Sequence, residues 1–209
     1  MGNADLAEAV LDRDADTSLV DGNGLNAFQI SLERAGADER FARSKLPAVF
    51  ERLAPASLDL QIDGRLVKLD RRLMEYLMLC IAMVLFYQRL GENWASRGRL
   101  FSAIDFAEVL AHFPESVVPA RRKNRAYISS ILSKNDVSRQ GPYNRNLFLR
   151  VRHGQYLINP KLAVRVEGDW RLIYELLCAD RLAGELRDPL RWAGQVWDLN
   201  ADRERAMVA

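Results

Sequence analysis

A long apolar run near the middle of the chain sets the strongest constraint on the fold. Residues 73–87 are 15 positions of which only Glu75 is charged, and Arg71 and Arg72 precede them. A membrane-spanning helix needs about 20 consecutive apolar residues. The run is too short for that, so it predicts the central helix of a folded core, and we expect no membrane partner.

The composition agrees with an ordinary folded protein of 209 residues. Apolar residues make up 49% of the chain and charged residues 28%, with only 12 Gly and 7 Pro, which argues against a disordered or fibrous chain. Cys80 and Cys178 are too few for a disulfide framework and too far apart for a zinc site. Because no basic segment precedes an apolar run at the N-terminus, the expected location is the reducing cytoplasm.

Apolar periodicity and turn residues divide the chain into three predicted segments. Residues 1–56 are expected to form a helical N-terminal extension, and residues 161–209 a helical C-terminal extension with two or three helices after 169. Residues 57–160 predict a hairpin around Asp63-Gly64, a long helix at 71–90 capped by Asp70, helices at 102–112 and about 120–134, and a hairpin around Gly154. The fold class is therefore mainly α with small β-hairpins.

Charge is concentrated in one part of the chain. The formal net charge of the whole protein is only +2, but residues 119–160 hold nine Lys or Arg and a single acid, Asp136. A solvated face normally mixes both signs. A window of this kind indicates a localised contact with a polyanion, and we expect double-stranded DNA as the partner.

The helix predicted at about 120–134 has the pattern of a DNA-recognition helix. Ile128, Ile131 and Leu132 share one face, while Arg122 and Arg125 lie on the other with small hydroxyl residues beside them. Small residues allow a helix to lie close to the floor of a groove, and arginine supplies bidentate hydrogen bonds to guanine or phosphate.

The following hairpin offers a second basic surface. Arg150 and Arg152 are two positions apart on a strand, so they are expected to project from the same face, with His153 at the turn. The predicted DNA-binding residues of the helix, the approach loop and the hairpin are Arg121, Arg122, Lys123, Arg125, Ser129, Ser130, Ser133, Lys134, Arg139, Arg145, Arg150, Arg152 and His153.

The order hairpin, long helix, short helix, basic helix, hairpin resembles the winged helix-turn-helix superfamily over about residues 70–160. The run 156–160 (YLINP) is similar to the end of the wing in small plasmid replication initiators. The runs 127–132 (YISSIL) and 151–156 (VRHGQY) are similar to the third helix and closing hairpin of response-regulator output domains. The resemblance implies a winged-helix DNA-binding domain at 57–160. The residues before this segment do not resemble a receiver domain, so the resemblance is not expected to extend to phosphorylation control.

Metal and catalytic chemistry are poorly supported. Asp12, Asp14 and Asp16 imitate the opening of an EF-hand loop, but Thr17 and Asn23 occupy the positions that need Gly and Glu. His112 and His153 are the only histidines, and no carboxylate or thiol cluster accompanies either. We expect no enzyme, no metal and no cofactor.

Apolar stripes in both extensions need a cover. They comprise Phe41, Leu46, Val49, Phe50 and Leu53 before the central segment, and Trp170, Ile173, Leu177, Trp192 and Trp197 after it. A homodimer held by a flank is expected, with packing inside the chain or a protein partner on the flanking helices as alternatives.

Three functions follow in order of preference. The first is a sequence-specific DNA-binding protein acting as a transcription regulator. The second is a plasmid or phage replication initiator, or another mobile-element DNA-binding protein, that uses the same surface. The third is a winged-helix subunit that binds a protein partner or has an architectural role.

Overall fold

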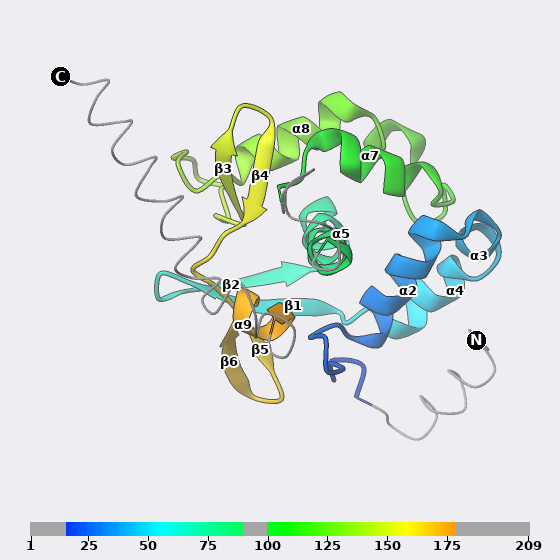
Figure 1. Ribbon diagram of the computed structural model, residues 1–209, viewed down its shortest axis with the longest axis horizontal. Helices are drawn as coiled ribbons and strands as arrows, with labels where there is room; N and C mark the ends of the chain where they lie inside the picture. Colours follow the sequence, from blue (N-terminus) through cyan, green and yellow to red (C-terminus); the bar gives the residue numbers. More distant parts are fainter. Residues whose placement is uncertain (1–15, 90–99, 179–209) are drawn as a thin grey trace.

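The computed structural model describes residues 16–89 and 100–178, which form a mixed α/β structure (Figure 1). Helix α5 (Met74–Gln88) lies at its centre. Helices α2 (Ala27–Ala37), α3 (Glu39–Ser44) and α4 (Leu46–Leu53) cover one side of α5, and α7 (Ala103–Ala111) and α8 (Arg125–Lys134) lie over another. A four-stranded sheet and a two-stranded hairpin complete the enclosure.

Helix α5 is covered around its whole circumference. Twelve of its fifteen residues are buried, as expected for a helix that is apolar on all sides. The predicted central helix is confirmed, but the predicted cap is wrong. Leu73 occupies the N-cap position without a side-chain bond, while the Asp70 carboxylate accepts a 2.8 Å hydrogen bond from the Arg72 amide and closes a turn before the helix. None of the described helices has the length and apolarity needed to cross a bilayer.

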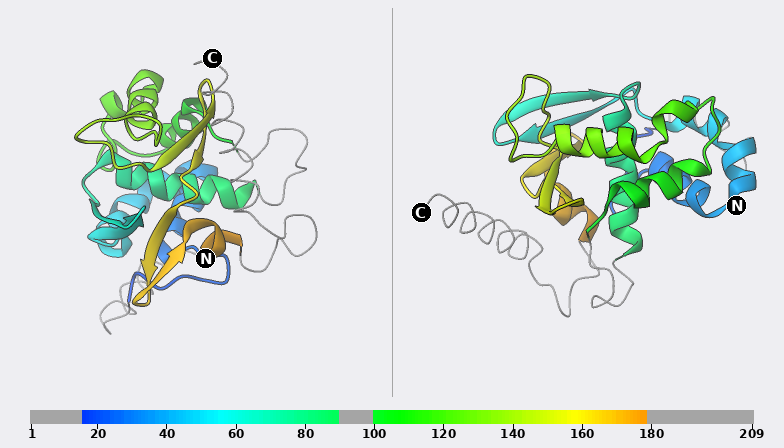
Figure 2. Two further views of the ribbon diagram at one scale, coloured as in Figure 1. Left: turned by 90° about the vertical axis from the view of Figure 1, so that its left-hand side faces the viewer. Right: turned by 90° about the horizontal axis from the view of Figure 1, so that it is seen from above.

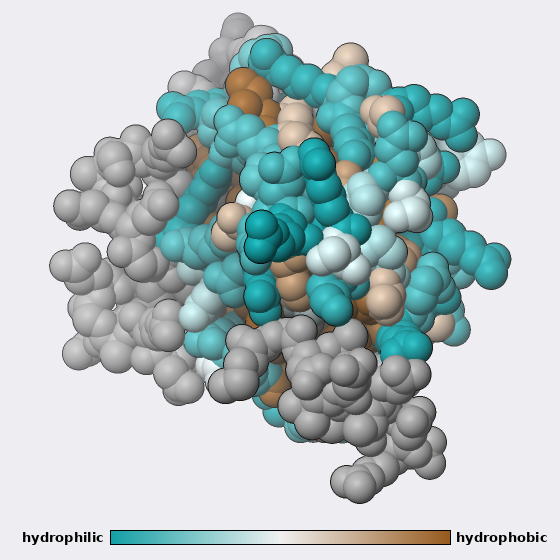
Figure 3. Space-filling view, turned by 90° about the vertical axis from the view of Figure 1, so that its right-hand side faces the viewer, coloured by the Kyte–Doolittle hydropathy of each residue, from teal (hydrophilic) through white to brown (hydrophobic). Residues whose placement is uncertain are grey.

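The N-terminal helices pack against α5, so they belong to the common core. Phe28 of α2 meets Tyr76 of α5 with ring centroids 6.1 Å apart, and Phe50 of α4 meets Phe28 at 5.5 Å. Phe41 and Leu46 are buried, and the rest of the predicted stripe packs on the core. The outer face of these helices is mainly hydrophilic (Figure 3). The chain thus covers its own N-terminal stripe.

The larger sheet joins two distant parts of the sequence. Strands β1 (Ser57–Ile62) and β2 (Arg65–Asp70) form the predicted hairpin, with positive φ at Asp63 and Gly64. Strand β5 (Leu162–Val166) pairs with the other edge of β1, and β6 (Asp169–Leu172) pairs with β5. The sheet order is β2-β1-β5-β6, antiparallel throughout.

The C-terminal segment is therefore not wholly helical, and the prediction of a helical extension from 161 is wrong for residues 162–172. Trp170 lies on strand β6 and is 39% exposed. Helix α9 (Ile173–Cys178) follows directly, with Ile173 and Leu177 buried. The predicted helices beyond 178 with Trp192 and Trp197, the predicted N-terminal helix and the acidic positions Asp12 and Asp14 lie outside the described residues.

Two contacts attach the C-terminal segment to the rest. The Tyr174 hydroxyl donates a 2.8 Å hydrogen bond to the Ile158 carbonyl. In addition, Gly24 lies so close to α9 that a β-carbon there would stand 2.2 Å from the Leu176 carbonyl oxygen. Two features therefore require glycine at position 24. One is this close approach, and the other is its φ of +74°, which side chains rarely adopt. Residues from all three predicted segments belong to one apolar cluster.

Candidate nucleic-acid interface

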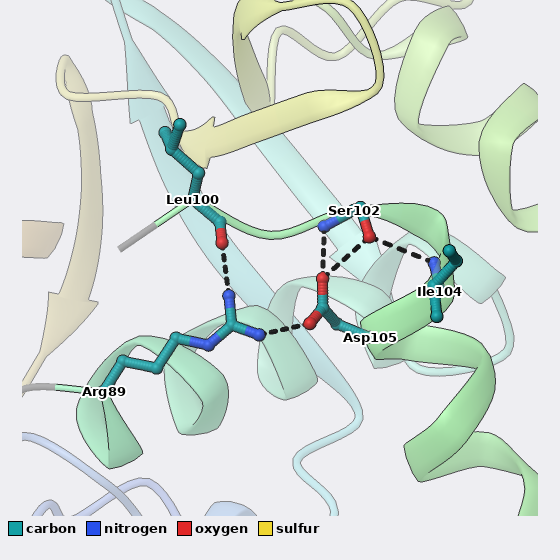
Figure 4. Close-up of polar contacts among 5 residues, drawn as sticks. All are labelled: Arg89, Leu100, Ser102, Ile104 and Asp105. Atoms are coloured by element: carbon teal, nitrogen blue, oxygen red, sulfur yellow. Dashed lines mark hydrogen bonds and ion pairs between the residues drawn. The ribbon is translucent and has the colours of Figure 1, made fainter. Parts of the chain in front are cut away.

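Helix α7 is fixed to the end of α5 by a network of polar contacts (Figure 4). Asp105 accepts a 2.6 Å hydrogen bond from the Ser102 amide, and the Ser102 hydroxyl accepts one from the Ile104 amide, which completes a capping box. The Arg89 guanidinium, at the end of α5, donates to the Leu100 carbonyl and pairs with the Asp105 carboxylate. The predicted cap at Ser102 is confirmed, and this network sets the position of α7.

Helix α8 begins five residues later than predicted. Residues Ala120–Arg122 form a short 3-10 helix, and Asn124 then caps α8 by accepting a 2.8 Å hydrogen bond from the Tyr127 amide. Asn124 separates the 3-10 helix from α8, because its side chain caps the start of a new helix. Apolar periodicity alone does not reveal such a break. Arg121 and Arg122 therefore precede α8 instead of forming its first turn.

The two faces of α8 differ as the sequence predicts. Ile128, Ile131 and Leu132 are buried beneath it. Arg125, Ser129 and Lys134 are exposed, while Ser130 and Ser133 are half-buried. The outward face of the helix therefore combines cations with small hydroxyl side chains.

Lys123 has a role inside the helix pair. Its ammonium group donates a hydrogen bond to the Phe113 carbonyl, in the turn that leaves α7. The contact closes the segment between α7 and α8. This cation supports the geometry of the helix pair.

The hairpin after α8 forms as predicted, but its two arginines have different environments. Strands β3 (Phe148–Arg152) and β4 (Gln155–Ile158) pair with a register shift between Arg150 and Arg152, so strict alternation is lost. The Arg150 guanidinium lies 3.1 Å from the carboxylate of Asp136, which is fully buried. Arg152 and His153 are exposed at the turn. The expectation that both arginines project alike from one face is not met.

A third strand segment borders the hairpin. Phe101 and Tyr156 exchange two backbone hydrogen bonds of 2.9 and 2.8 Å, which form an antiparallel bridge on the free edge of β4. The Phe101 ring meets Phe106 of α7 at 5.4 Å and Phe148 of β3 at 6.1 Å. Burial raises the pKa of the Tyr156 hydroxyl. These contacts place the hairpin beside α7 and α8 as one unit.

The loop between α8 and β3 contains a further structural arginine. Arg145 lies 3.2 Å from the carboxylate of Glu75, the single acid of α5. This ion pair with Arg145 explains why the apolar run contains one charged residue, Glu75. Arg139 in the same loop is exposed.

The predicted cations therefore separate into two groups. Lys123, Arg145 and Arg150 bind groups within the protein. Six others make no ion pair with any described residue; they are Arg121, Arg122, Arg125, Lys134, Arg139 and Arg152. They come from the 3-10 helix before α8, from α8 itself, from the loop after it and from the hairpin turn. Because the acid of this window, Asp136, is buried beneath Arg150, nothing anionic interrupts them along residues 119–160.

The structural roles of two residues in this region were not predicted from the sequence. Asp136 organises the start of the loop, because its carboxylate accepts 3.2 and 2.9 Å hydrogen bonds from the amide and hydroxyl of Ser138. Its position as the lone acid among cations was the available signal. Tyr143 is 84% exposed at the loop tip. The preceding turn dipeptide Gly141-Pro142 was the one sequence signal for an exposed position there.

Metal chemistry finds no support in the part of the chain that the structure describes, where no three His, Cys, Asp or Glu side chains form a possible metal site. Comparison with known proteins adds no relative: no family model matches the chain, and neither the curated proteins nor the solved structures contain a significant match.

Proposed function

We propose that the protein binds double-stranded DNA through α8 and the β3–β4 hairpin, as a sequence-specific transcription regulator. The observation that carries this proposal is the exposed half of α8, where Arg125 and Lys134 flank Ser129 on the side of the helix that faces away from the buried Ile128, Ile131 and Leu132. A rigid helix with cations and small hydroxyl groups on one face suits the major groove.

The arrangement of the neighbouring elements supports a winged helix-turn-helix. Along the chain come α5, the Phe101 bridge, α7, α8, and the β3–β4 hairpin, with the Phe101 segment paired to the hairpin. In this fold the second helix of the turn lies in the major groove, and the hairpin contacts phosphates or an adjacent groove. Both surfaces lie at the same end of the molecule, away from β5 and β6 (Figure 1).

The salt dependence of DNA binding tests the proposal. The full chain is titrated against a fluorescein-labelled duplex of about 30 base pairs, which spans about three helical turns, at a series of salt concentrations. Neutralisation of phosphates by several cations gives a steep linear fall of log affinity with log salt. Absence of binding even at about 50 mM salt would overturn the proposal and favour the protein-binding alternative.

The same surface serves a replication initiator. Selection of bound fragments from genomic DNA separates the two roles: sites in promoters support a regulator, and repeated sites at an origin support an initiator.

The homodimer and a protein partner on the flanking helices stay predictions. Within the N-terminal stripe, Phe41 and Leu46 are buried and the other members are partly buried against the core, so packing inside the chain covers most of this stripe. Light scattering measures the oligomeric state in solution, and a mass near the 23.8 kDa of one chain would contradict the dimer.

A further inference from the structure

The loop between α8 and β3 presents an aromatic ring to solvent beside the proposed DNA surface. Tyr143 is 84% exposed, more than any other large apolar side chain among the described residues. Figure 2 shows the loop projecting from the body of the molecule, next to the end of α8 and beside β3. Burying such a ring on a partner recovers apolar area that folding has left in water.

The loop that carries the ring is held by a buried asparagine. Asn144 is 6% exposed, and its side-chain amide donates hydrogen bonds of 2.8 and 2.6 Å to the carbonyls of Asp136 and Arg139. Its side-chain oxygen accepts a 2.7 Å bond from the Asn146 amide. Three bonds from one side chain thus fix the backbone on both sides of Tyr143.

The tip of the loop is a tight turn joined to α8. The Asn144 amide donates a 3.1 Å hydrogen bond to the Gly141 carbonyl, which places Pro142 and Tyr143 at the centre of the turn. Asn135, directly after α8, accepts a 3.2 Å bond from the Arg145 amide. The position of the ring relative to α8 is therefore set before any partner binds, so little backbone entropy is lost on binding.

The surroundings of the ring favour a nucleic acid over a protein. Between the buried Asp136 and the end of the hairpin there is no exposed acid, and Arg139 is exposed in the same loop. Protein-binding surfaces join several apolar residues into a patch, with charge reduced at the centre. Aromatic rings beside cations stack on bases in proteins that bind single strands, and apolar wedges contact base steps in proteins that bind duplexes.

We propose that Tyr143 is a base-contacting wedge: its ring packs against a base step of the duplex bound by α8 and the hairpin, and partly unstacks that step. This inference rests on the proposed DNA binding. Apolar side chains placed against base steps commonly act in this way, because the cost of unstacking is repaid by closer contact. Arg139, exposed in the same loop, would contact the DNA backbone while the ring contacts the bases.

The test compares Tyr143→Ala and Tyr143→Phe in the full chain with the labelled duplex of mixed sequence. Loss of the ring should weaken binding about tenfold, whereas the phenyl ring of Tyr143→Phe should keep affinity within about twofold of wild type. The salt slope should stay unchanged in both, because neither changes a charge. Trp170→Ala removes an exposed ring on β6, at the other end of the molecule, and serves as the matched control.

A second measurement reports the base directly. Duplexes of a fragment recovered in the genomic selection, which fixes the binding register, and carrying 2-aminopurine at successive positions, should show a fluorescence increase at one step with wild type and with Tyr143→Phe, and none with Tyr143→Ala. If Tyr143→Ala binds and unstacks like wild type while Arg125→Ala weakens binding, the wedge is disproved and DNA binding stands. If wild type fails to bind the duplex, the proposed function itself fails.

Discussion

The guanidinium of Arg150 lies 3.1 Å from the carboxylate of Asp136, and that carboxylate is fully buried. Among the residues that the structure describes, Arg150 is the cation paired with this buried charge at the junction of the loop and the hairpin. A buried carboxylate that loses its cation is costly, because the charge has been removed from bulk water and then lacks its main compensating partner. Arg150 thus supports the fold of the hairpin first, and any contact with phosphate comes second.

Replacing Arg150 and Arg152 separately should give different results. Arg150→Ala should lower the free energy of unfolding by about 1–3 kcal/mol, since the Asp136 carboxylate then lacks its cation. Arg152→Ala, at an exposed position, should change stability by less than about 0.5 kcal/mol and reduce the salt slope of DNA binding by about one unit. Urea unfolding and anisotropy titrations measure both. Equal stability losses in the two variants would contradict the assignment.

The outer face of α8 predicts a local loss of affinity. Arg125→Ala should weaken specific binding by about 1–3 kcal/mol and leave unfolding unchanged. Arg171→Ala removes the same charge from an exposed position on β6 and should have little effect on binding. Anisotropy at matched salt compares the two. Equal effects would mean that only net charge matters and that α8 is not the recognition helix.

The approach of Gly24 to α9 predicts a stability defect. Gly24→Ala combines a β-carbon 2.2 Å from the Leu176 carbonyl oxygen with a φ of +74°, and should lower the free energy of unfolding by about 2–5 kcal/mol. Gly168→Ala shares a positive φ but meets nothing within 4 Å, and should cost only about 1–2 kcal/mol. Urea unfolding distinguishes the two costs, and equal losses would show that the contact with α9 is not tight.

Cys80 predicts a pH dependence of stability. Burial raises the pKa of its thiol from 9.0 to about 12 in the folded protein. Between these values the unfolded chain releases the proton and the folded protein keeps it. The free energy of unfolding should therefore fall as the pH rises above about 9, by up to about 1.4 kcal/mol per pH unit from this group. Tyr76, whose pKa burial also raises, acts in the same direction.

The control for this effect is Cys80→Ala. Urea unfolding at pH values on both sides of about 9 should show a weaker loss of stability in the variant than in wild type. Identical slopes would contradict a protonated buried thiol.

Local signals predicted most of the proposed DNA-binding unit. The length of the apolar run, the Ser102 cap and the turns at Asp63-Gly64 and Gly154 each act within a few residues, so they can be detected in the sequence. The β5–β6 hairpin was not predicted, because β5 is held in the sheet by pairing with β1, which is far away in the sequence. A local signal existed in Glu167-Gly168, both of which have positive φ as at Asp63-Gly64.

The roles of individual cations were harder to predict. Nothing local distinguishes Arg145 or Arg150, which pair with Glu75 and Asp136, from Arg125, which does not. The partners of the first two come from a distant helix and from a loop that bends back under the hairpin. Such pairs depend on tertiary packing, so the charge of a segment overstates the charge that its surface presents.

The pairing of Ile62 with Leu162 spans 100 positions of the chain. During synthesis β1 and β2 can pair at once, but the second edge of β1 has no neighbour until β5 has left the ribosome. By then all residues of α5, α7, α8 and the β3–β4 hairpin have been made. At elongation rates of about 5–20 residues per second, that edge waits for about 5–20 s. Unpaired strand edges invite association with other chains, so a nascent chain stalled before residue 162 is expected to associate through the free edge of β1.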